Sequence, residues 1–366
     1  MNLLTSGEWL SLGVAFPLSL ILTRTLIFLA QKQGWVAKPK ADRWHQKPTA
    51  LYGGVAIVLT FLLTSLAFMP RMISQERFDL IGLLIGGLAI FGVGLRDDIK
   101  PLNPFVKMVG QSMALTPYLV GMVLTHKAPL YVFSLPLIVF WTLALMNSLN
   151  MLDNMDGLSA GVSTIFAGLI AFYGFETGSP FVAGLGLLLA LSCLGFLFFN
   201  LPVKGSAKIF MGDCGSMFLG ILAAGLTVSG ISVTTPYLMN KVLVPILLLA
   251  VPLFDTALVV IIRKREGRSV SQGGRDHSSH RLVYTGRSDK QTVGILFGLE
   301  LLTGAAALIA ERTQYPAATL GVFLVALVGF RAFGIYLSRF AQPVLTTASS
   351  QTKAVVRDGR TTGVRG

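Results

Sequence analysis

Long apolar runs, each of about 20 residues, recur from one end of this 366-residue sequence to the other. A run of that length and composition crosses the hydrocarbon layer of a bilayer as an α-helix. The sequence therefore predicts an all-α polytopic membrane protein, a bundle of about eleven transmembrane helices. The expected spans cover residues 9–30, 52–70, 79–95, 105–124, 130–147, 158–176, 180–199, 214–233, 242–262, 291–310 and 316–338.

No internal repeat and no separate soluble region interrupts these runs. We therefore expect residues 1–340 to form a single transmembrane domain. The tail, residues 341–366, is rich in Thr, Ser, Gly and Arg and is predicted to be disordered. The first run has no basic segment before it, so we interpret it as a retained span and not a cleaved signal.

Lys and Arg are distributed unevenly between the connections. Most of them lie around residues 32–47, 96–107, 204–208 and 263–290 and in the tail. The alternate connections contain only Arg71, Arg77, Lys127, Lys241 and Arg312. Because positive connections stay in the cytoplasm, we expect a multi-pass inner-membrane protein with its N-terminus outside and its C-terminus in the cytoplasm. This topology accounts for the net charge of +13 without nucleic acid as a partner.

A polar stretch, residues 147–157, separates two of the apolar runs. Asn150, Asp153 and Asp156 recur every three residues in it, so on a helical turn they share one face. Such a row beside lipid is costly unless it binds something. Its oxygen atoms suit a hard cation together with a polar substrate. The alternative is a polar capping loop between two helices.

Six carboxylates fall on the predicted cytoplasmic side of the membrane. They are Asp97, Asp98, Asp153, Asp156, Asp213 and Asp276. Acidic residues follow no strong sidedness rule of their own. The sequence therefore predicts one site, assembled where several loops meet at the inner membrane face.

The loops differ in chemistry. Asp97 and Asp98 are adjacent, so they repel unless a cation or a proton lies between them, or else they form a solvated helix end. Lys107 can hold a phosphate as a point charge. Asp213 stands next to glycine before a predicted helix, which fits either a metal that bridges phosphates or a simple N-cap.

Two of the four histidines, His277 and His280, lie in a loop rich in Gly and Arg, with Arg281 directly after them. Their spacing is compatible with zinc, but no further Cys or His is close in the sequence. An Arg and His cluster that binds pyrophosphate is the more natural interpretation.

Several motifs occur in this order along the chain. They are Lys47-Pro48 with Gly53-Gly54, Asp97-Asp98 with Asn103-Pro104 and Lys107, Asn150-x-x-Asp153-x-x-Asp156-Gly157-Leu158, Asn200, Ile209-Phe210-Met211-Gly212-Asp213-x-Gly215-Ser216, Pro252-x-x-Asp255-Thr256, and His277-x-x-His280-Arg281-Leu282. Together they resemble the polyprenyl-phosphate N-acetylhexosamine-1-phosphate transferases. The likeness is closest to the bacterial undecaprenyl-phosphate GlcNAc-1-phosphate transferase branch. The resemblance implies a helical bundle of ten or eleven spans with a cytoplasmic cleft.

The resemblance also implies a reaction. A polyprenyl phosphate, such as undecaprenyl phosphate, attacks the β-phosphorus of a UDP-N-acetylhexosamine and releases UMP. The cofactor implied is Mg²⁺, with Mn²⁺ as an alternative, because charge builds on phosphoryl oxygens. The bilayer is the other partner, and a homodimer is compatible with the resemblance.

The resemblance assigns roles to particular residues. Asp213 is the expected metal ligand, with Asn150 as the second candidate. Phe210 is expected to stack on uracil and Asp156 to hydrogen-bond the uracil edge. The expected catalytic residues are Asp97, Asp98, Lys107, Asp153, His277 and His280, and the expected substrate-binding residues are Lys47, Asn150, Asp156, Asn200, Phe210 and Arg281. Asp97 and Asp98 are expected to face the lipid phosphate, and whether either acts as a base is left open.

One departure from the family pattern bears on the substrate. Many bacterial members have His-x-His-His in the last motif, where this chain has Ser279. The triple-His form of the phospho-N-acetylmuramoyl-pentapeptide transferases is absent, which favours UDP-GlcNAc but keeps that branch as the alternative. A membrane transporter is the alternative from another class. A transporter places carboxylates within its spans, where this chain has only Asp255 and Glu300 well inside.

Overall fold

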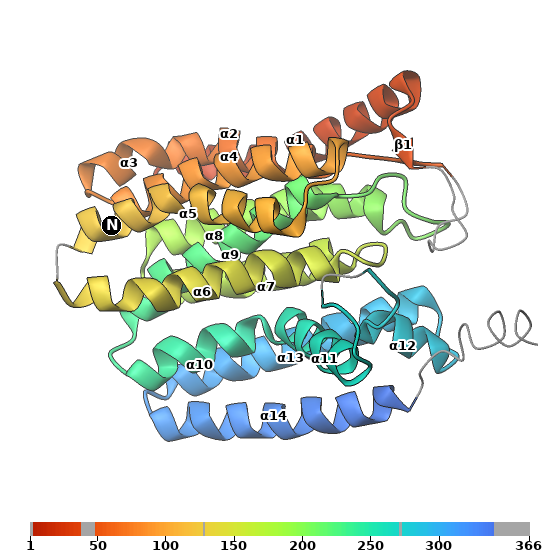
Figure 1. Cartoon of the computed structure of the whole chain (residues 1–366). Helices are drawn as coiled ribbons and strands as arrows, with labels where there is room; N and C mark the ends of the chain where they lie inside the picture. Colours follow the sequence, from red (N-terminus) through yellow and green to blue (C-terminus); the bar gives the residue numbers. More distant parts are fainter. Residues whose placement is uncertain (1–2, 38–47, 127–128, 271–272, 340–366) are drawn as a thin grey trace, which may run out of the picture.

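The computed structural model describes residues 3–37, 48–126, 129–270 and 273–339. Its helices run roughly parallel and antiparallel to one another in a bundle (Figure 1). The long helices are α1 (Ser6–Gln33), α4 (Phe78–Ile99), α5 (Pro104–His126), α6 (Pro129–Leu152), α7 (Leu158–Glu176), α8 (Pro180–Asn200), α9 (Asp213–Thr234), α13 (Asp289–Arg312) and α14 (Pro316–Ser338). The shorter elements are α2 (Gly54–Ser65), η1 (Leu66–Phe68), α3 (Met69–Ser74), α10 (Leu238–Leu248), α11 (Ala250–Arg265), α12 (Ser278–Tyr284), β1 (Val36–Ala37) and β2 (Thr49–Ala50).

The predicted architecture is confirmed. Ten spans in the described residues are long and apolar enough to cross a membrane, and there are eleven if the bent pair α10–α11 counts as one. Lys47, predicted to bind substrate, and the tail from residue 341, predicted to be disordered, both lie outside the described residues.

Helix α9 is the centre of the bundle. It is buried along its whole apolar length, and it packs against α4, α6, α7 and α10. By contrast, α14 lies along one edge of the bundle and leaves its apolar side chains exposed, as a lipid-facing helix does (Figure 1). The first residue of α9 is Asp213, so the central helix presents this carboxylate at one end of the bundle.

The expected ninth span, residues 242–262, is broken. Helices α10 and α11 meet at Leu249, which has non-helical backbone angles, and they are bent by 77°. Pro252 provides the physical reason. Its ring nitrogen cannot donate to the carbonyl of Leu248, four residues earlier, and its ring crowds that carbonyl. A continuous helix through Leu249 is therefore disfavoured.

A buried carboxylate supports the break. Glu300 of α13 has no solvent exposure, and its Oε2 accepts a hydrogen bond of 2.9 Å from the backbone N–H of Val251. Val251 lies in the first turn of α11, where backbone N–H groups have no partner within the helix. In the membrane interior an unsatisfied N–H is costly, so Glu300 stabilises the start of α11.

We expect Glu300→Leu to lower the free energy of unfolding by about 1–3 kcal/mol, because it leaves the Val251 N–H without an acceptor. Glu300→Gln keeps an acceptor oxygen in the same place and serves as the matched control. Thermal unfolding in detergent measures both variants. Equal stabilities for the Leu and Gln variants would contradict this role.

Candidate active site

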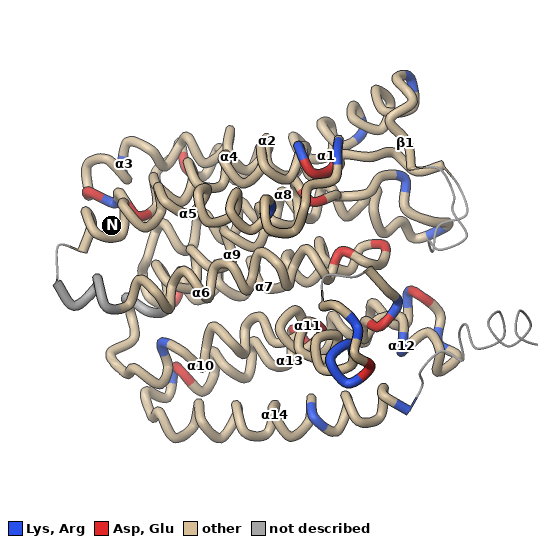
Figure 2. The backbone as a smooth tube through the Cα atoms, in the orientation of Figure 1, with Lys and Arg blue, Asp and Glu red and all other residues tan. Residues whose placement is uncertain are grey.

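The acidic residues predicted to form one site lie at one end of the bundle. Asp97 and Asp98 end α4, Asp153 and Asp156 follow α6, and Asp213 starts α9. Figure 2 shows acidic and basic residues gathered toward the right-hand end, where the connections around α11 and α12 also lie. Antiparallel helices bring these ends together, although the residues are far apart in the sequence.

Lys107 is the centre of this cluster. From the first turns of α5, its ammonium contacts Asp97 Oδ2 at 3.0 Å and the carboxylate of Asp213. It also donates to Asn150 Oδ1 at 3.2 Å. Asn150 Nδ2 in turn donates to Asp213 Oδ1 at 2.8 Å and to Ser216 Oγ at 2.9 Å. The ends of four helices are therefore joined by one network of charge-assisted hydrogen bonds.

Asp98 binds the start of α9. Its Oδ1 accepts from the backbone N–H of Asp213 at 2.8 Å, and its Oδ2 accepts from that of Cys214 at 3.0 Å. These are orphan N–H groups at the start of α9. Gly212 has φ +79°, and a Cβ atom there would lie 2.7 Å from Asp98 Oδ2. Asp98 therefore caps α9 and positions Asp213, and its contact with the lipid phosphate stays a prediction.

Asp153 lies in the turn between α6 and α7. Burial, together with the negative charges of Asp213 and Asp98, raises the pKa of the Asp153 carboxyl to about 7, although the Gly212 N–H opposes the shift. A carboxyl group with this pKa can change its protonation near neutral pH. This is the range in which a general acid or base works best.

Asp156 and Asn200 organise the loop that leads to Asp213. Asp156 Oδ2 accepts from the backbone N–H of Ala207 at 2.9 Å. Asn200 is buried, its Oδ1 accepts from Gly157 N–H and its Nδ2 donates to the carbonyl of Ile209, both at 2.8 Å. The amide of Asn200 thus binds backbone groups and supports this loop, and its role in substrate binding stays a prediction.

The same loop pairs with the chain just before α2. Phe210 N–H donates to Ala50 O at 2.9 Å, and Gly53 N–H donates to Phe210 O at 2.8 Å. A Cβ atom on Gly53 would lie 2.7 Å from Phe210 O, so only glycine permits this approach. The half-buried Phe210 is thereby held three residues before Asp213.

The histidines are held by Asp255 of α11. Asp255 Oδ2 lies 2.7 Å from His277 Nδ1, and its Oδ1 accepts from the backbone N–H and the hydroxyl of Ser278, each at 2.7 Å. The rings of His277 and His280 are perpendicular, with centroids 5.9 Å apart. The break at Leu249 directs α11 so that Asp255 meets the start of α12.

Arg281 and Ser279 face inward. The Arg281 guanidinium donates to the backbone carbonyls of Asp276 at 3.0 Å and Leu337 at 3.3 Å. Ser279 is fully buried and donates to Asn154 Oδ1 at 2.6 Å. Arg281 therefore fastens α12 to the end of α14, and Ser279 fastens α12 to the 147–157 stretch. The role of Arg281 in substrate binding stays a prediction.

Asp276, the sixth predicted carboxylate, pins the loop before α12. Arg263 Nε contacts its Oδ2 at 3.0 Å and Arg268 contacts its Oδ1 at 2.8 Å. Burial acts to raise the pKa of Asp276, but the hydrogen bonds from Arg268 and Arg263 outweigh it and lower this pKa below its ordinary value. Asp276 is thus a structural anion.

The buried His280 should make the free energy of unfolding depend on pH. Burial and the nearby charge of His277 lower the pKa of His280 to about 4, from an ordinary value of 6.5. The unfolded chain therefore binds a proton at this residue that the folded chain does not bind between about pH 6.5 and pH 4. Stability is lost as the pH falls through this range, by about 2 kcal/mol from pH 7 to pH 5.

We expect His280→Gln to make the melting temperature in detergent less sensitive to pH between 7.5 and 5 than that of the unmodified protein. Parallel pH profiles for the two proteins would show that His280 does not titrate in this way. At neutral pH the His280 imidazole is therefore uncharged.

The oxygen donors fit a magnesium ion that is shared with a substrate. In the part of the chain that the structure describes, no group of three or more His, Cys, Asp or Glu side chains could hold a metal ion. Mg²⁺ commonly takes only one or two protein carboxylates and completes its shell with water and phosphate oxygens. The Asp213 carboxylate and the Asn150 carbonyl oxygen converge at Lys107 and have the chemistry required.

Sequence reasoning missed three supporting residues. Ser216 and Asn154 complete the hydrogen bonds of Asn150 and Ser279, and Asp255 orders the start of α12. Asp255 and Ser216 each carried a signal, since they stand in the quoted motifs Pro252-x-x-Asp255 and Gly212-Asp213-x-Gly215-Ser216. The role of Asn154 depends on which helix ends meet, and the sequence does not state this.

Known proteins share this sequence pattern. Residues 80–231 match the family described as glycosyl transferase family 4. A probable undecaprenyl-phosphate N-acetylglucosaminyl 1-phosphate transferase of Bacillus subtilis is 31% identical over 313 residues, covering 81% of this chain and 84% of the relative. A decaprenyl-phosphate N-acetylglucosaminephosphotransferase of Mycobacterium tuberculosis is 30% identical over 338 residues, covering 81% and 82%. A phospho-N-acetylmuramoyl-pentapeptide-transferase of Chlamydia muridarum is 32% identical over 248 residues, covering 57% and 71%.

Proposed function

Because this chain belongs to glycosyl transferase family 4, we propose that it transfers N-acetylglucosamine 1-phosphate from UDP-N-acetylglucosamine to a polyprenyl phosphate. UMP is released, and the product is a sugar on a lipid pyrophosphate. In the cell this is the first membrane step of a cell-envelope glycan. The observation that carries the proposal is the network of Lys107, Asp97, Asn150 and Asp213 at the end of a bundle of apolar helices. It offers charged, phosphate-compatible groups where a lipid can present its head.

The reaction needs little covalent help from the protein. An oxygen of the lipid phosphate forms a bond to the β-phosphorus of the UDP-sugar, and the bond from that phosphorus to the bridging oxygen breaks. The electron pair leaves with UMP. The attacking phosphate monoester is already largely ionised at neutral pH, since its second pKa is about 6. Alignment of the two substrates and neutralisation of their charge are therefore the main tasks.

The described residues can share these tasks. Lys107 donates to phosphoryl oxygens, and Asp97 sets the position of the Lys107 ammonium through their 3.0 Å ion pair. Asp153, with its pKa near 7, can hold or release a proton beside them. Phe210 lies on the loop before Asp213, and Asp156 binds that loop through the Ala207 N–H; these two side chains are the proposed contacts of the uracil. His277, oriented by Asp255, is the proposed contact of the sugar phosphate.

Magnesium is part of the proposal. Asp213 and Asn150 would hold the ion together with the diphosphate. When bound, it would neutralise charge that develops on the phosphoryl oxygens. The oxygen-only donor set at Lys107 supports this choice of metal.

Release of UMP tests the proposed function directly. Purified protein would be incubated with undecaprenyl phosphate, Mg²⁺ and one of a panel of UDP-sugars. We expect UMP with UDP-GlcNAc, and none when the lipid phosphate is omitted. If UDP-N-acetylmuramoyl-pentapeptide were the one UDP-sugar that gave UMP, the chain would instead be a phospho-N-acetylmuramoyl-pentapeptide transferase. Absence of UMP with every UDP-sugar would overturn the proposal.

The site is proposed to face the cytoplasm, which follows from the distribution of Lys and Arg. Cysteine labelling tests this, because the natural Cys193 and Cys214 are both buried. Ser206→Cys places a thiol on an exposed loop at the site end, and Gln75→Cys places one at the opposite end. An impermeant maleimide should label the Ser206 variant only after permeabilisation and the Gln75 variant in intact spheroplasts. The reverse pattern would place the site outside.

A further inference from the structure

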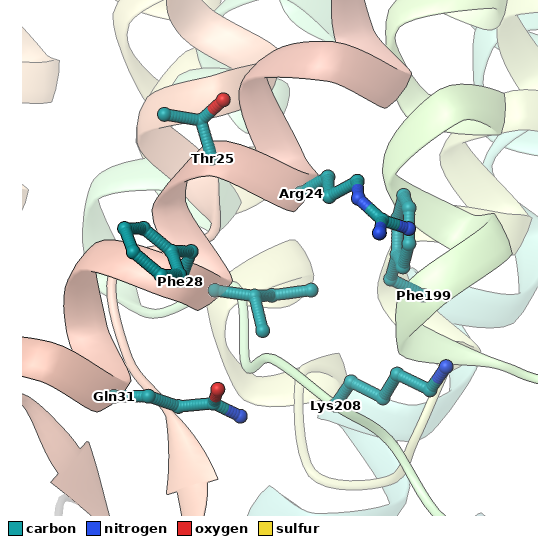
Figure 3. A pocket seen from close by; sticks show the side chains of 7 residues that line it. Arg24, Thr25, Phe28, Gln31, Phe199 and Lys208 are labelled. Carbon is teal, nitrogen blue, oxygen red and sulfur yellow. The ribbon is translucent and has the colours of Figure 1, made fainter.

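A cavity of about 440 Å³ lies between α1 and the end of α8, apart from the Lys107 network. Its lining comes from Arg24, Thr25, Ile27, Phe28 and Gln31 of α1, Phe199 of α8, and Lys208 of the following loop. Figure 3 shows that the Arg24 and Lys208 side chains both extend toward the Phe199 side of this space. Two cations from distant parts of the sequence thus share one cavity.

The cavity lacks a counter-charge. None of its lining residues is acidic, and the described residues make no salt bridge with Arg24 or Lys208. Two like charges that face one space repel each other, and an anion between them removes the repulsion. Gln31 adds neutral hydrogen-bond donors to the same lining, whereas the Thr25 hydroxyl already donates to Ile21 O at 2.8 Å.

The surroundings of the cavity indicate a lipid. On α1, Ile21 is 61% exposed and Phe28 is 64% exposed, while on α8 Phe198 is 66% exposed. Exposed apolar side chains on membrane-spanning helices face the acyl chains of the bilayer. Helix α1 has 28 residues, and Arg24 lies about 14 Å before its end at 1.5 Å per residue. A hydrocarbon layer of about 30 Å then places Arg24 near the membrane boundary on the site's side.

We propose that this cavity binds the phosphate of an anionic phospholipid from the leaflet on the site's side. Arg24 and Lys208 would contact the phosphate, and the acyl chains would lie along the apolar faces of α1 and α8. Basic pockets between transmembrane helices bind lipid head groups in this way. The occupant is a structural lipid, distinct from the polyprenyl phosphate that reacts at the Lys107 network.

Such a lipid would also brace the loop that carries the site. The backbone N–H of Lys208 donates to Phe199 O at 3.0 Å, and Lys208 O accepts from Ala50 N–H at 3.3 Å. Lys208 stands two residues before Phe210 and five before Asp213 in the sequence. A phosphate held by Lys208 would therefore restrain the segment that positions both residues.

The test measures lipid binding without any sugar nucleotide, so it is independent of the proposed reaction. Purified protein in detergent would be titrated with phosphatidylglycerol and, separately, phosphatidylcholine, following melting temperature and lipid retention by native mass spectrometry. We expect phosphatidylglycerol to stabilise the protein more than phosphatidylcholine. In the double variant Arg24→Gln/Lys208→Gln, the phosphatidylglycerol concentration that gives half-saturation should rise about 30-fold, because two cationic contacts are lost.

A matched control removes the same charge elsewhere. Lys204→Gln/Arg331→Gln alters one exposed cation in the same loop and one on α14. It should keep the response of the unmodified protein to phosphatidylglycerol. An equal loss in both double variants, or no loss in the first, would overturn the proposal. Two further results would overturn it. One is stabilisation by undecaprenyl phosphate without stabilisation by phosphatidylglycerol, and the other is a rise in melting temperature with inorganic phosphate that equals the rise with phosphatidylglycerol.

Discussion

Asp213→Asn is expected to lower kcat for UMP release by roughly 1,000-fold, since it removes the carboxylate at the centre of the charged network. Asp213 contacts both Lys107 and Asn150, so its charge acts on every group there that is proposed to meet the diphosphate. The amide has nearly the same shape and can still accept from Asn150. The folded state should therefore survive, and its melting temperature in detergent should stay close to that of the unmodified protein.

The measurement is a UMP-release assay across a series of Mg²⁺ concentrations. If Asp213 holds the ion, the loss of kcat should be accompanied by a higher Mg²⁺ requirement. Glu266→Gln is the matched control, because it removes one exposed carboxylate at the same end of the bundle. Full activity of Asp213→Asn in the presence of a chelator would refute the assignment of the metal to this residue.

Asp97→Asn and Asp98→Asn are expected to fail in different ways. Asp97 contacts Lys107 through Oδ2 and accepts from the Leu102 N–H through Oδ1, and the amide oxygen of Asn can keep this second contact. Asp97→Asn should therefore lower kcat by about 100- to 1,000-fold and leave the melting temperature nearly unchanged. Asp98 accepts two backbone N–H groups of α9, and an amide can accept through only one of its two terminal atoms. Asp98→Asn should therefore lower the free energy of unfolding by about 1.5–3 kcal/mol, with activity falling as a consequence.

The two variants control for each other, since they make the same chemical change at adjacent positions. Thermal unfolding and UMP release would be measured on the same preparations, with UDP-sugar affinity as a third observable. A stable but inactive Asp98→Asn would mean that Asp98 meets the substrate directly. A collapse of UDP-sugar affinity in Asp97→Asn with kcat preserved would assign Asp97 to nucleotide binding.

The sequence by itself determined the architecture and the location of the site. The apolar runs specify spans because an exposed backbone group in lipid is too costly, so each run must form a helix. The order of the spans then fixes which loops share a side, and this brings the loops that contain Asp97, Asp153 and Asp213 to one end. The residue types state what chemistry is available there, namely oxygen donors and a few cations.

The tertiary structure decided which partner each of these residues has within the protein. Arg281 was expected to bind substrate, yet it contacts backbone carbonyls, and Asn200 likewise fastens a loop. The break at Leu249 was also hidden, although Pro252 was visible, since proline inside a span can be accommodated with a mere kink. Packing against Glu300 stabilises the full break.

Asp97 and Asp98 show the physical reason for this division. They are the same residue type and adjacent in the sequence, so no pattern distinguishes them. On a helix of 3.6 residues per turn, however, neighbours are rotated by about 100°. One carboxylate therefore faces Lys107 on α5, and the other faces the start of α9. A sequence specifies what each side chain can bind, but the partner is chosen by the helices that pack on either side of it.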